Sequence, residues 1–271
     1  MKRMLITGAS GFLGSRIAAY YKKRYEILAP AHEEMDITDE LSVLQYFCAH
    51  KPDIVVHCAA MSDVGACQRK PERSWKVNVV GTENIVKAAK AVGAVCLCSS
   101  SDQVYCGMEG VEPHKEDREV HPTNVYGKEK AYAERSCLEI YDKSVHLRLA
   151  WMYDAQDEKR MDFIKQLKNC KTKEMFFSPM DRRGITNVWE VVKNIEPALE
   201  LPGGVYNFGS VNDRSTYDTV KDIFAVKEYD ISLVKKMESA TPRNLTMNQE
   251  KLNRYGIHFS TTIQGVLECG F

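Results

Sequence analysis

The chain has 271 residues, enough to bury a large core in one α/β domain or in a domain with a smaller companion. Lys plus Arg and Asp plus Glu each total 37, so no net charge favours nucleic acid or an anionic membrane surface as a partner. No apolar run reaches membrane-spanning length, and no room is left for a signal peptide before the first strand. We therefore expect a cytoplasmic protein.

The nine cysteines are odd in number, scattered, and mostly placed inside apolar runs. This usage favours reduced core thiols over disulfides. Cys96 and Cys98 could form a metal pair, but no second Cys/His pair stands at ligand spacing, so we expect no metal site.

The first 150 residues or so alternate short apolar runs with amphipathic stretches, the pattern of a parallel sheet with crossover helices. We expect strands at Arg3 to Thr7, Tyr25 to Ala29, Asp53 to His57, Ala94 to Ser99 and Val145 to Leu149. Helices should lie between them, at Phe12 to Lys23, Asp39 to His50, Val77 to Val92 and Thr123 to Asp142. The predicted fold is α/β, a doubly wound parallel sheet of the Rossmann type, with its ligand across the carboxyl ends of the strands.

A glycine-rich segment follows the first strand and indicates a strand, a phosphate loop and a helix. Gly8 permits the tight turn, Gly11 lets the backbone approach a pyrophosphate, and Gly14 allows close helix packing. Amide groups at the start of the helix would face the phosphates. The expected cofactor contacts here are Gly8, Ser10, Gly11, Phe12, Leu13 and Gly14. Because the spacing is Gly-x-x-Gly-x-x-Gly, a glycine-rich turn without a ligand remains the alternative.

The residues after the second and third strands bear on the choice of cofactor. The second strand closes on Pro-Ala-His32 without the acid that selects NAD, so NAD(H) and NADP(H) both stay open, with a slight lean to NADP(H). Asp36 could sit by the adenine or cap the next helix. Ala59 and Ala60 are small enough for a cofactor to lie against the backbone. Asn78 could brace the sheet end or simply cap a helix.

A serine-rich strand end and a Tyr-x-x-x-Lys pattern indicate catalysis. Tyr126 and Lys130 are four residues apart on an expected helix and share one face. A cation beside a phenol should lower the pKa of the phenol toward the working range. The Ser101 hydroxyl, opposite, could hold a substrate carbonyl. Two exposed helix residues are the alternative reading of the Tyr–Lys pattern.

The remaining chain forms a second region. We expect a division into a dinucleotide-binding domain, residues 1–151, and a smaller substrate-binding region, residues 152–271, interleaved with the first. Helices are expected at Met161 to Cys170 and Asn187 to Leu199, and a strand at Gly204 to Gly209. The loops between them should form a lid over the sheet edge. Arg182, Arg183 and Arg243 could hold a nucleotide diphosphate, or could be solvated surface side chains.

Together these motifs resemble those of the extended short-chain dehydrogenases/reductases, and within them the dTDP-4-dehydrorhamnose reductase (RmlD-like) family. The segments that carry the likeness are Thr7 to Gly14, Asn78 to Thr82, Ser101 to Tyr105, Tyr126 to Lys130, Arg148 to Tyr153, Asp181 to Thr186 and Thr241 to Leu252. The first half is specific to the superfamily. The second half is looser, but it points to this family.

The resemblance implies an NAD(P)H-dependent oxidoreductase that reduces a nucleotide-linked 4-keto-6-deoxy sugar. It makes Ser101, Tyr126 and Lys130 the catalytic residues, with Tyr126 and Lys130 also contacting the cofactor. It implies that Trp151 borders the sugar pocket, although a core role for Trp151 is the alternative. Oligomeric state cannot be read from the sequence, and a homodimer stays open because many relatives pair.

Two departures from the family pattern matter. Gln103 stands where the reductases have Tyr and where sugar-nucleotide dehydratases have Glu. A neutral amide cannot take a proton, so reduction survives this change and dehydration should not. The segment from Met61 to Gln68 replaces the substrate-side segment of the reductases, which leaves the identity of the sugar open.

Two other functions fit the same scaffold. One is a nucleotide-sugar epimerase of the superfamily, which oxidises and then re-reduces its substrate. The other is a cofactor-binding regulatory protein without turnover, similar to the regulatory subunit of methionine adenosyltransferase. The fold cannot choose between them, because one scaffold hosts many activities.

Overall fold

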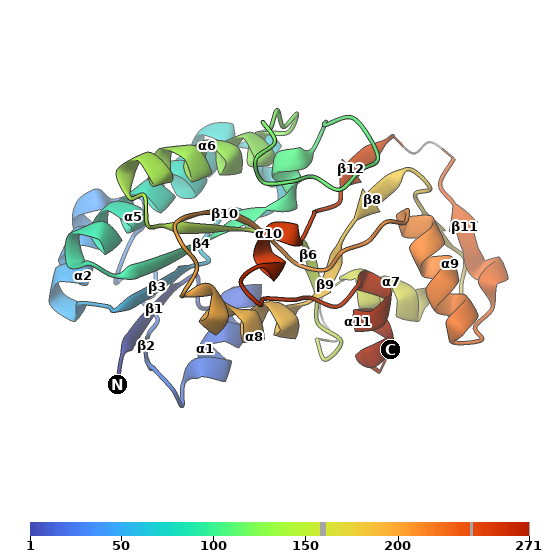
Figure 1. The fold of residues 1–271 in the computed structure, drawn as a ribbon, viewed down its shortest axis with the longest axis horizontal. Coiled ribbons are helices and arrows are strands. Elements are labelled where there is room, and N and C mark those ends of the chain that lie inside the picture. The colour runs from blue at the N-terminus through green and yellow to red at the C-terminus, as the bar shows by residue number, and fades with distance from the viewer. Residues whose placement is uncertain (158–160, 239–240, 271) are drawn as a thin grey trace. The chain divides into compact units, whose positions relative to one another are not determined.

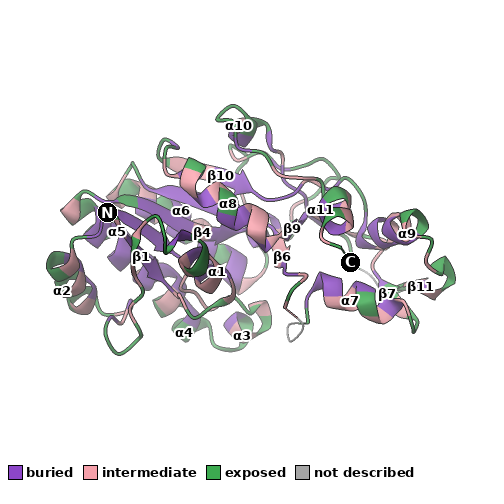
Figure 2. Cartoon of the chain, turned by 90° about the horizontal axis from the view of Figure 1, so that it is seen from below, coloured by how far each residue is buried: buried purple, intermediate pink, exposed green. Residues whose placement is uncertain are grey.

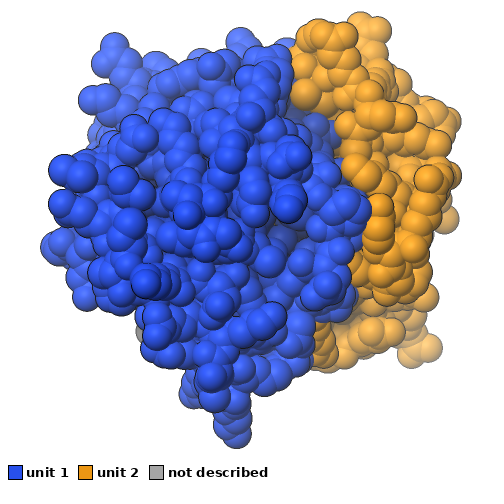
Figure 3. Space-filling view, turned by 60° about the vertical axis from the view of Figure 1, so that its left-hand side comes forward, with its two compact units in different colours: residues 1–104, 122–148, 194–206 blue, residues 105–121, 149–193, 207–271 orange. Residues whose placement is uncertain are grey.

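The computed structural model describes residues 1–157, 161–238 and 241–270. These residues divide into two compact units, which are coloured separately in Figure 3. Unit 1 comprises residues 1–104, 122–148 and 194–206, and unit 2 comprises the described residues of 105–121, 149–193 and 207–271. Each unit is therefore built from three separate stretches of chain.

A six-stranded sheet, almost all of it in unit 1, has the strand order β10-β5-β4-β3-β1-β2 (Figure 1). Its strands are β1 (Arg3–Thr7), β2 (Glu26–Leu28), β3 (Ile54–His57), β4 (Val95–Ser101), β5 (Val145–Leu149) and β10 (Gly204–Phe208). β1 pairs in parallel with β2 on one side and β3 on the other, and β3 pairs in parallel with β4. The order of the strands along the chain reverses at β1 and β3, and such a switch point opens the crevice in which α/β proteins bind their ligands.

Helices cover both faces of this sheet. In unit 1 they are α1 (Phe12–Tyr21), α2 (Glu40–His50), α3 (Val64–Arg69), α4 (Pro71–Trp75), a π-helical turn η1 (Lys76–Val80), α5 (Gly81–Val92) and α6 (Val125–Ile140). α2, α5 and α6 lie side by side on one face, and α1 lies on the other (Figure 1). Leu5, Val55 and Cys96 from the strands pack with Phe47 of α2 and Ile85 of α5, which makes the sheet almost wholly buried (Figure 2).

Unit 2 has its own core. Its elements, two of which continue into unit 1, are η2 (Asp102–Tyr105), β6 (Trp151–Tyr153), α7 (Phe163–Cys170), β7 (Met175–Phe177), β8 (Asp181–Arg183), β9 (Ile185–Asn187), α8 (Val188–Ala198), α9 (Thr216–Val226), η3 (Ile231–Leu233), β11 (Val234–Lys236), β12 (Arg243–Leu245), α10 (Glu250–Asn253) and α11 (Thr262–Glu268). The short strands form three parallel pairs, β6 with β9, β7 with β11 and β8 with β12. Tyr153, Phe163 and Phe224 are among the side chains buried between these pairs and the helices.

The predicted α/β fold is confirmed. The bounds of β1 and β5 are those expected, and the other predicted elements end within a few residues of the observed ones. The stretch expected as one helix at Val77 to Val92 begins instead with the π-helical turn η1. Helices α3 and α4 were not expected. None of the helices in the described ranges is long and apolar enough to cross a membrane.

Candidate active site

The turn from β1 into α1 leaves no space for a side chain at Gly8 or Gly14. Gly8 adopts the left-handed region, with φ of 65°, and a Cβ there would lie 2.8 Å from Ala59 Cα. A Cβ on Gly14 would lie 2.4 Å from the Gly8 carbonyl oxygen. Gly11 closes the turn by donating its N–H to the Gly8 carbonyl at 2.9 Å, and it caps α1 without a side chain. The first amides of α1 are thus left for an anion, and the cradle fits the phosphates of a dinucleotide.

A buried histidine ties the end of β1 to the end of β3. His57 Nδ1 lies 2.7 Å from Thr7 Oγ1, which also accepts the N–H of Ala59. His57 Nε2 lies 3.1 Å from Thr82 Oγ1, whose own proton goes to the Asn78 carbonyl. This series of hydrogen bonds assigns the ring proton of His57 to Nε2. Burial, then the neighbouring Lys130 and His146, lowers the pKa of His57 to about 3.

The predicted catalytic tyrosine and lysine lie together on the buried face of α6. Lys130 Nζ is 5.8 Å from the centre of the Tyr126 ring and donates to the Ser99 carbonyl at 2.9 Å. Asn124 caps the helix by accepting the Gly127 N–H at 2.7 Å. A Cβ on Gly127 would lie 2.3 Å from the carbonyl oxygen of Gln103, so the helix approaches the end of β4 as closely as only glycine allows. The exposed-residue reading of the Tyr–Lys pattern is therefore wrong.

Ser101 ends β4 beside the same tyrosine. Its hydroxyl donates to Asp102 Oδ1 at 3.2 Å and accepts the N–H of Gln103 at 3.2 Å. Burial, followed by the charges of Asp102 and Cys67, raises the pKa of Tyr126, and the Ser101 hydroxyl acts in the opposite direction. The expected lowering of this pKa is therefore wrong, because burial and the neighbouring negative charges raise it. The phenol keeps its proton at neutral pH.

His32 and Asp36, two of the expected cofactor contacts, lie close together, and Asp36 also forms hydrogen bonds within the chain. His32 Nδ1 lies 3.8 Å from Asp36 Oδ1. The same carboxylate oxygen accepts both the N–H and the hydroxyl of Thr38 at 2.9 Å. The cap of α2 is Asp39, so the reading of Asp36 as the helix cap is wrong. A contact of His32, Asp36 or Ala60 with the cofactor stays a prediction.

In unit 2 the structure brings two of the four candidate substrate-binding residues together. The guanidinium of Arg183 lies 5.2 Å from the centre of the Trp151 ring, within the range of a cation–π contact. Arg243 instead forms a two-point ion pair with Asp181, at 2.7 and 2.9 Å. The side chain of Arg182 donates to the Asp213 carbonyl at 2.6 Å. Substrate binding by any of them stays a prediction.

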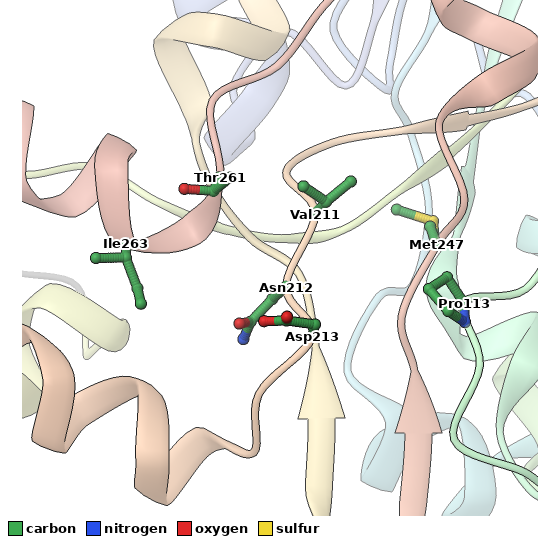
Figure 4. A pocket seen from close by; sticks show the side chains of 7 residues that line it. All are labelled: Pro113, Val211, Asn212, Asp213, Met247, Thr261 and Ile263. Carbon is green, nitrogen blue, oxygen red and sulfur yellow. The ribbon is translucent and has the colours of Figure 1, made fainter.

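Unit 2 also contains a pocket of about 300 Å³ (Figure 4). Its lining residues are Pro113, Val211, Asn212, Asp213, Met247, Thr261 and Ile263. None of the predicted site residues lines it, and the Asn212 amide is already used in hydrogen bonds to the Arg183 carbonyl and Thr219. Among the described residues, no group of three or more His, Cys, Asp or Glu could hold a metal ion, and every cysteine there is a free thiol.

Comparisons with known proteins place the chain in a family. The Rossmann-type sheet, the family model and the relatives found for the chain all fit the extended short-chain dehydrogenases/reductases. The chain belongs to the RmlD substrate binding domain family, whose model matches residues 1–260.

Individual relatives agree with this placement. The dTDP-4-dehydrorhamnose reductase of Aggregatibacter actinomycetemcomitans is 30% identical over 253 residues, covering 89% of this chain and 83% of that protein. Methionine adenosyltransferase 2 subunit beta of Xenopus laevis is 28% identical over 279 residues, covering 94% and 83%. The chain is also similar to a crystal structure of dTDP-4-dehydrorhamnose reductase from Bacillus anthracis in complex with NADP. The match covers 100% of this chain and 98% of the reductase chain. Its TM-score is 0.88 at 24% identity, which establishes the shared fold.

Proposed function

We propose that the chain is an NAD(P)H-dependent reductase of a nucleotide-linked 4-keto-6-deoxy sugar, similar to dTDP-4-dehydrorhamnose reductase. The observation that carries the proposal is a buried, protonated Tyr126 that lies with Lys130 beside Ser101 at the end of β4. A reductase needs a proton donor at this place, and the Tyr126 phenol carries a proton at neutral pH that it can donate. NADP(H) is the favoured cofactor, because His32 rather than an acid follows the second strand.

The residues of the chain divide the chemistry between them. The cofactor, when bound, supplies the hydride that reduces the keto carbon. Tyr126 gives its proton to the oxygen that develops negative charge, and Ser101 holds that oxygen by a hydrogen bond. Lys130, already held by the Ser99 carbonyl, binds the nicotinamide ribose and keeps its positive charge beside the phenol. Tyr126 therefore contacts both the cofactor and the substrate.

Gln103 limits the reaction to reduction. Its side chain accepts a hydrogen bond from Asn124 at 3.2 Å and lies 3.4 Å from Asp102. An amide in this place has no proton to exchange, so elimination of water lacks its base. In unit 2, the Trp151 and Arg183 pair is proposed to contact the nucleotide sugar. Location in the cytoplasm and pairing with a second copy are part of the proposal, and nucleic acid is not expected as a partner.

The test is an absorbance assay with purified protein and enzymatically generated dTDP-4-dehydrorhamnose, using NADPH and NADH separately. We expect oxidation of the reduced cofactor and a loss of about 10²- to 10⁴-fold in kcat for Tyr126→Phe. Tyr132→Phe is the matched control, because Tyr132 is exposed on the same helix, and it should keep full turnover. Full turnover by Tyr126→Phe would refute the catalytic assignment.

A regulatory role without turnover is the second candidate. It is favoured by the methionine adenosyltransferase subunit that aligns with 94% of the chain. The presence of Ser101, Tyr126 and Lys130 argues for turnover. Cofactor binding without turnover of any keto sugar, together with co-purification of an adenosyltransferase, would support the regulatory role instead. An epimerase would retain tightly bound NAD through purification.

A further inference from the structure

A buried carboxylate stands between the two catalytic residues of α6. Glu129 follows Tyr126 by three positions, directly precedes Lys130, and is only 2% exposed. Its Oε1 accepts the Ser74 hydroxyl at 2.5 Å, and its Oε2 accepts the Asn78 amide at 2.7 Å. Both donors are neutral. The mechanism above gives Glu129 no role.

A second glutamate on the same helix shows that Glu129 is unusual. Glu134 is also buried, but it forms an ion pair with Arg148, with 2.7 Å between Oε2 and the guanidinium. A buried carboxylate costs much free energy unless such a partner compensates it. Glu129 has no ion pair with any of the described residues. Because burying the Glu129 carboxylate without an ion pair costs free energy, we expect this side chain to do more than fill space in the core.

Glu129 determines how the Asn78 amide is oriented. Asn78 Nδ2 donates to Glu129 and also to the Met61 carbonyl at 3.0 Å, while its Oδ1 accepts the Met61 N–H at 2.9 Å. A flipped amide would bring Oδ1 against two acceptor oxygens and leave the Met61 N–H facing an amino group. Asn78 lies in the π-helical turn η1, and such turns are frequent at functional sites. The carboxylate therefore fixes both backbone groups of Met61 through one amide.

Met61 begins the segment that, by the family resemblance, replaces the substrate-side segment of the reductases. The Cys67 thiol, within the same segment, also donates to the Met61 carbonyl, at 3.3 Å. Helix α3 carries the segment on to Arg69 and contacts α6. The segment is thus held to the catalytic helix at its first residue, and Glu129 is the side chain of α6 that holds it.

We propose that Glu129 is a positioning residue which, through Asn78, holds the Met61 to Gln68 segment in the place where it selects the sugar. This inference rests on the proposed function and names the residue that links sugar selection to the catalytic helix.

The negative charge of Glu129 should affect the pH profile of kcat, which the loss of a purely structural contact would not change. The groups that act on the charge of Tyr126 are Asp102, Cys67 and Glu129, with the hydroxyl of Ser101 and the ammonium of Lys130. The negative charge of Glu129 disfavours the phenolate and favours the ammonium. Replacing it with a neutral amide lowers the pKa of both catalytic groups. The phenol then loses its proton at a lower pH, so the alkaline limb of kcat moves to lower pH.

The experiment compares Glu129→Gln with Glu139→Gln, the same change at an exposed position of α6. We expect Glu129→Gln to raise KM for the keto sugar about tenfold, the effect of losing one charged hydrogen bond, with KM for NADPH changed less than about twofold. The alkaline limb of kcat should move to lower pH. Glu139→Gln should match the wild type in both KM values and in the pH profile of kcat. Asn78→Ala removes the link but keeps the charge, so it should raise KM for the sugar without moving the pH profile.

Hydrogen exchange tests the link without turnover. Peptides covering residues 59–68 should exchange faster in Glu129→Gln and Asn78→Ala than in the wild type, while peptides of β1 stay protected. Unchanged exchange in 59–68, or an equal rise in both KM values, would overturn the proposal. If the wild-type protein turns over no keto sugar, the proposed function fails, while the exchange data still decide whether Glu129 holds this segment.

Discussion

His57 illustrates how a single side chain can support the cofactor site without touching a ligand. Its ring joins Thr7, the residue before Gly8, to Thr82 of α5, and it is only 1% exposed. Both ring nitrogens are used, one as donor and one as acceptor, which only the neutral ring can do. Protonation would turn the ring nitrogen that accepts from Thr7 into a second donor and would bury a positive charge. The network therefore holds the carboxyl ends of β1 and β3 together only while His57 is neutral.

This predicts a stability that falls in acid. The pKa of His57 is about 3 in the folded protein against 6.5 for the free side chain, so the unfolded chain binds a proton first. The contribution to the free energy of unfolding is complete above pH 6.5 and is lost as the pH falls toward 3. It amounts to a few kcal/mol, because each pH unit that separates the folded and unfolded pKa values is worth about 1.4 kcal/mol.

Thermal unfolding of the wild type and His57→Gln, followed between about pH 7 and pH 4, checks this prediction. The variant has a non-titrating amide and should lose less of its Tm across this range. It should still lose some, because the pKa of His146 is also lowered, to about 4, mainly by burial. His121→Gln removes an exposed histidine and should behave as the wild type. Identical pH slopes for the wild type and His57→Gln would contradict the assignment of a neutral ring.

The sequence predicts the catalytic residues more readily than the residues that support them. Tyr126 and Lys130 stand at a spacing that places them on one helix face, and the chemistry of a phenol beside an ammonium is readable from that spacing. His57 ends an apolar run and looks like an ordinary core residue. Glu129 lies between two catalytic residues, where a charged residue looks like a solvated position. Their roles depend on contacts with residues far along the chain, which no local pattern records.

At the scale of an element, the turn from β1 into α1 depends on close contact between backbone segments. Gly14→Ala would place a methyl group 2.4 Å from the Gly8 carbonyl oxygen, and backbone cannot move aside cheaply. We expect the loop to shift, NADPH to bind at least about tenfold more weakly, and stability to fall by about 1–3 kcal/mol.

The matched control is Gly65→Ala, whose methyl group would meet the terminal nitrogen of the flexible Arg69 side chain at 3.1 Å and Asp63 Oδ1 at 3.4 Å, an ordinary contact distance. Fluorescence titration with NADPH and thermal unfolding of both variants measure the difference. Wild-type affinity in Gly14→Ala would show that the loop does not hold the phosphates.

Elements differed in how far the sequence could predict them. β1 is an apolar run that ends at the glycine loop, and β5 alternates apolar residues with His146 and Arg148, so both patterns predict strands. The turn η1 keeps the apolar spacing of a helix and differs only in its hydrogen bonds, which the pattern does not show. The strands of unit 2 outside the six-stranded sheet are three residues long, too short for any alternation to be recognised. The ion pair of Arg243 with Asp181 depends on the pairing of β12 with β8, which no local pattern records.

At the scale of the whole molecule, the predicted site residues are distributed over the two units. The glycine loop, His57, Tyr126 and Lys130 all belong to unit 1, whereas Trp151 and Arg183 belong to unit 2. The proposed function therefore assigns the cofactor to unit 1 and most of the nucleotide sugar to unit 2. Ligands that bind only the folded state stabilise the segments that they contact.

Hydrogen exchange should separate the two assignments. NADPH alone should slow exchange in residues 7–14 and 57–60 of unit 1, and dTDP alone should slow exchange in residues 151–153 and 181–187 of unit 2. Arg183→Gln removes the cation that lies over Trp151, so it should abolish the protection by dTDP and leave the protection by NADPH unchanged. Protection of unit 1 alone by both ligands would mean that unit 2 does not recognise the nucleotide. The selection of substrate would then rest on the Met61 to Gln68 segment and the catalytic helix that holds it.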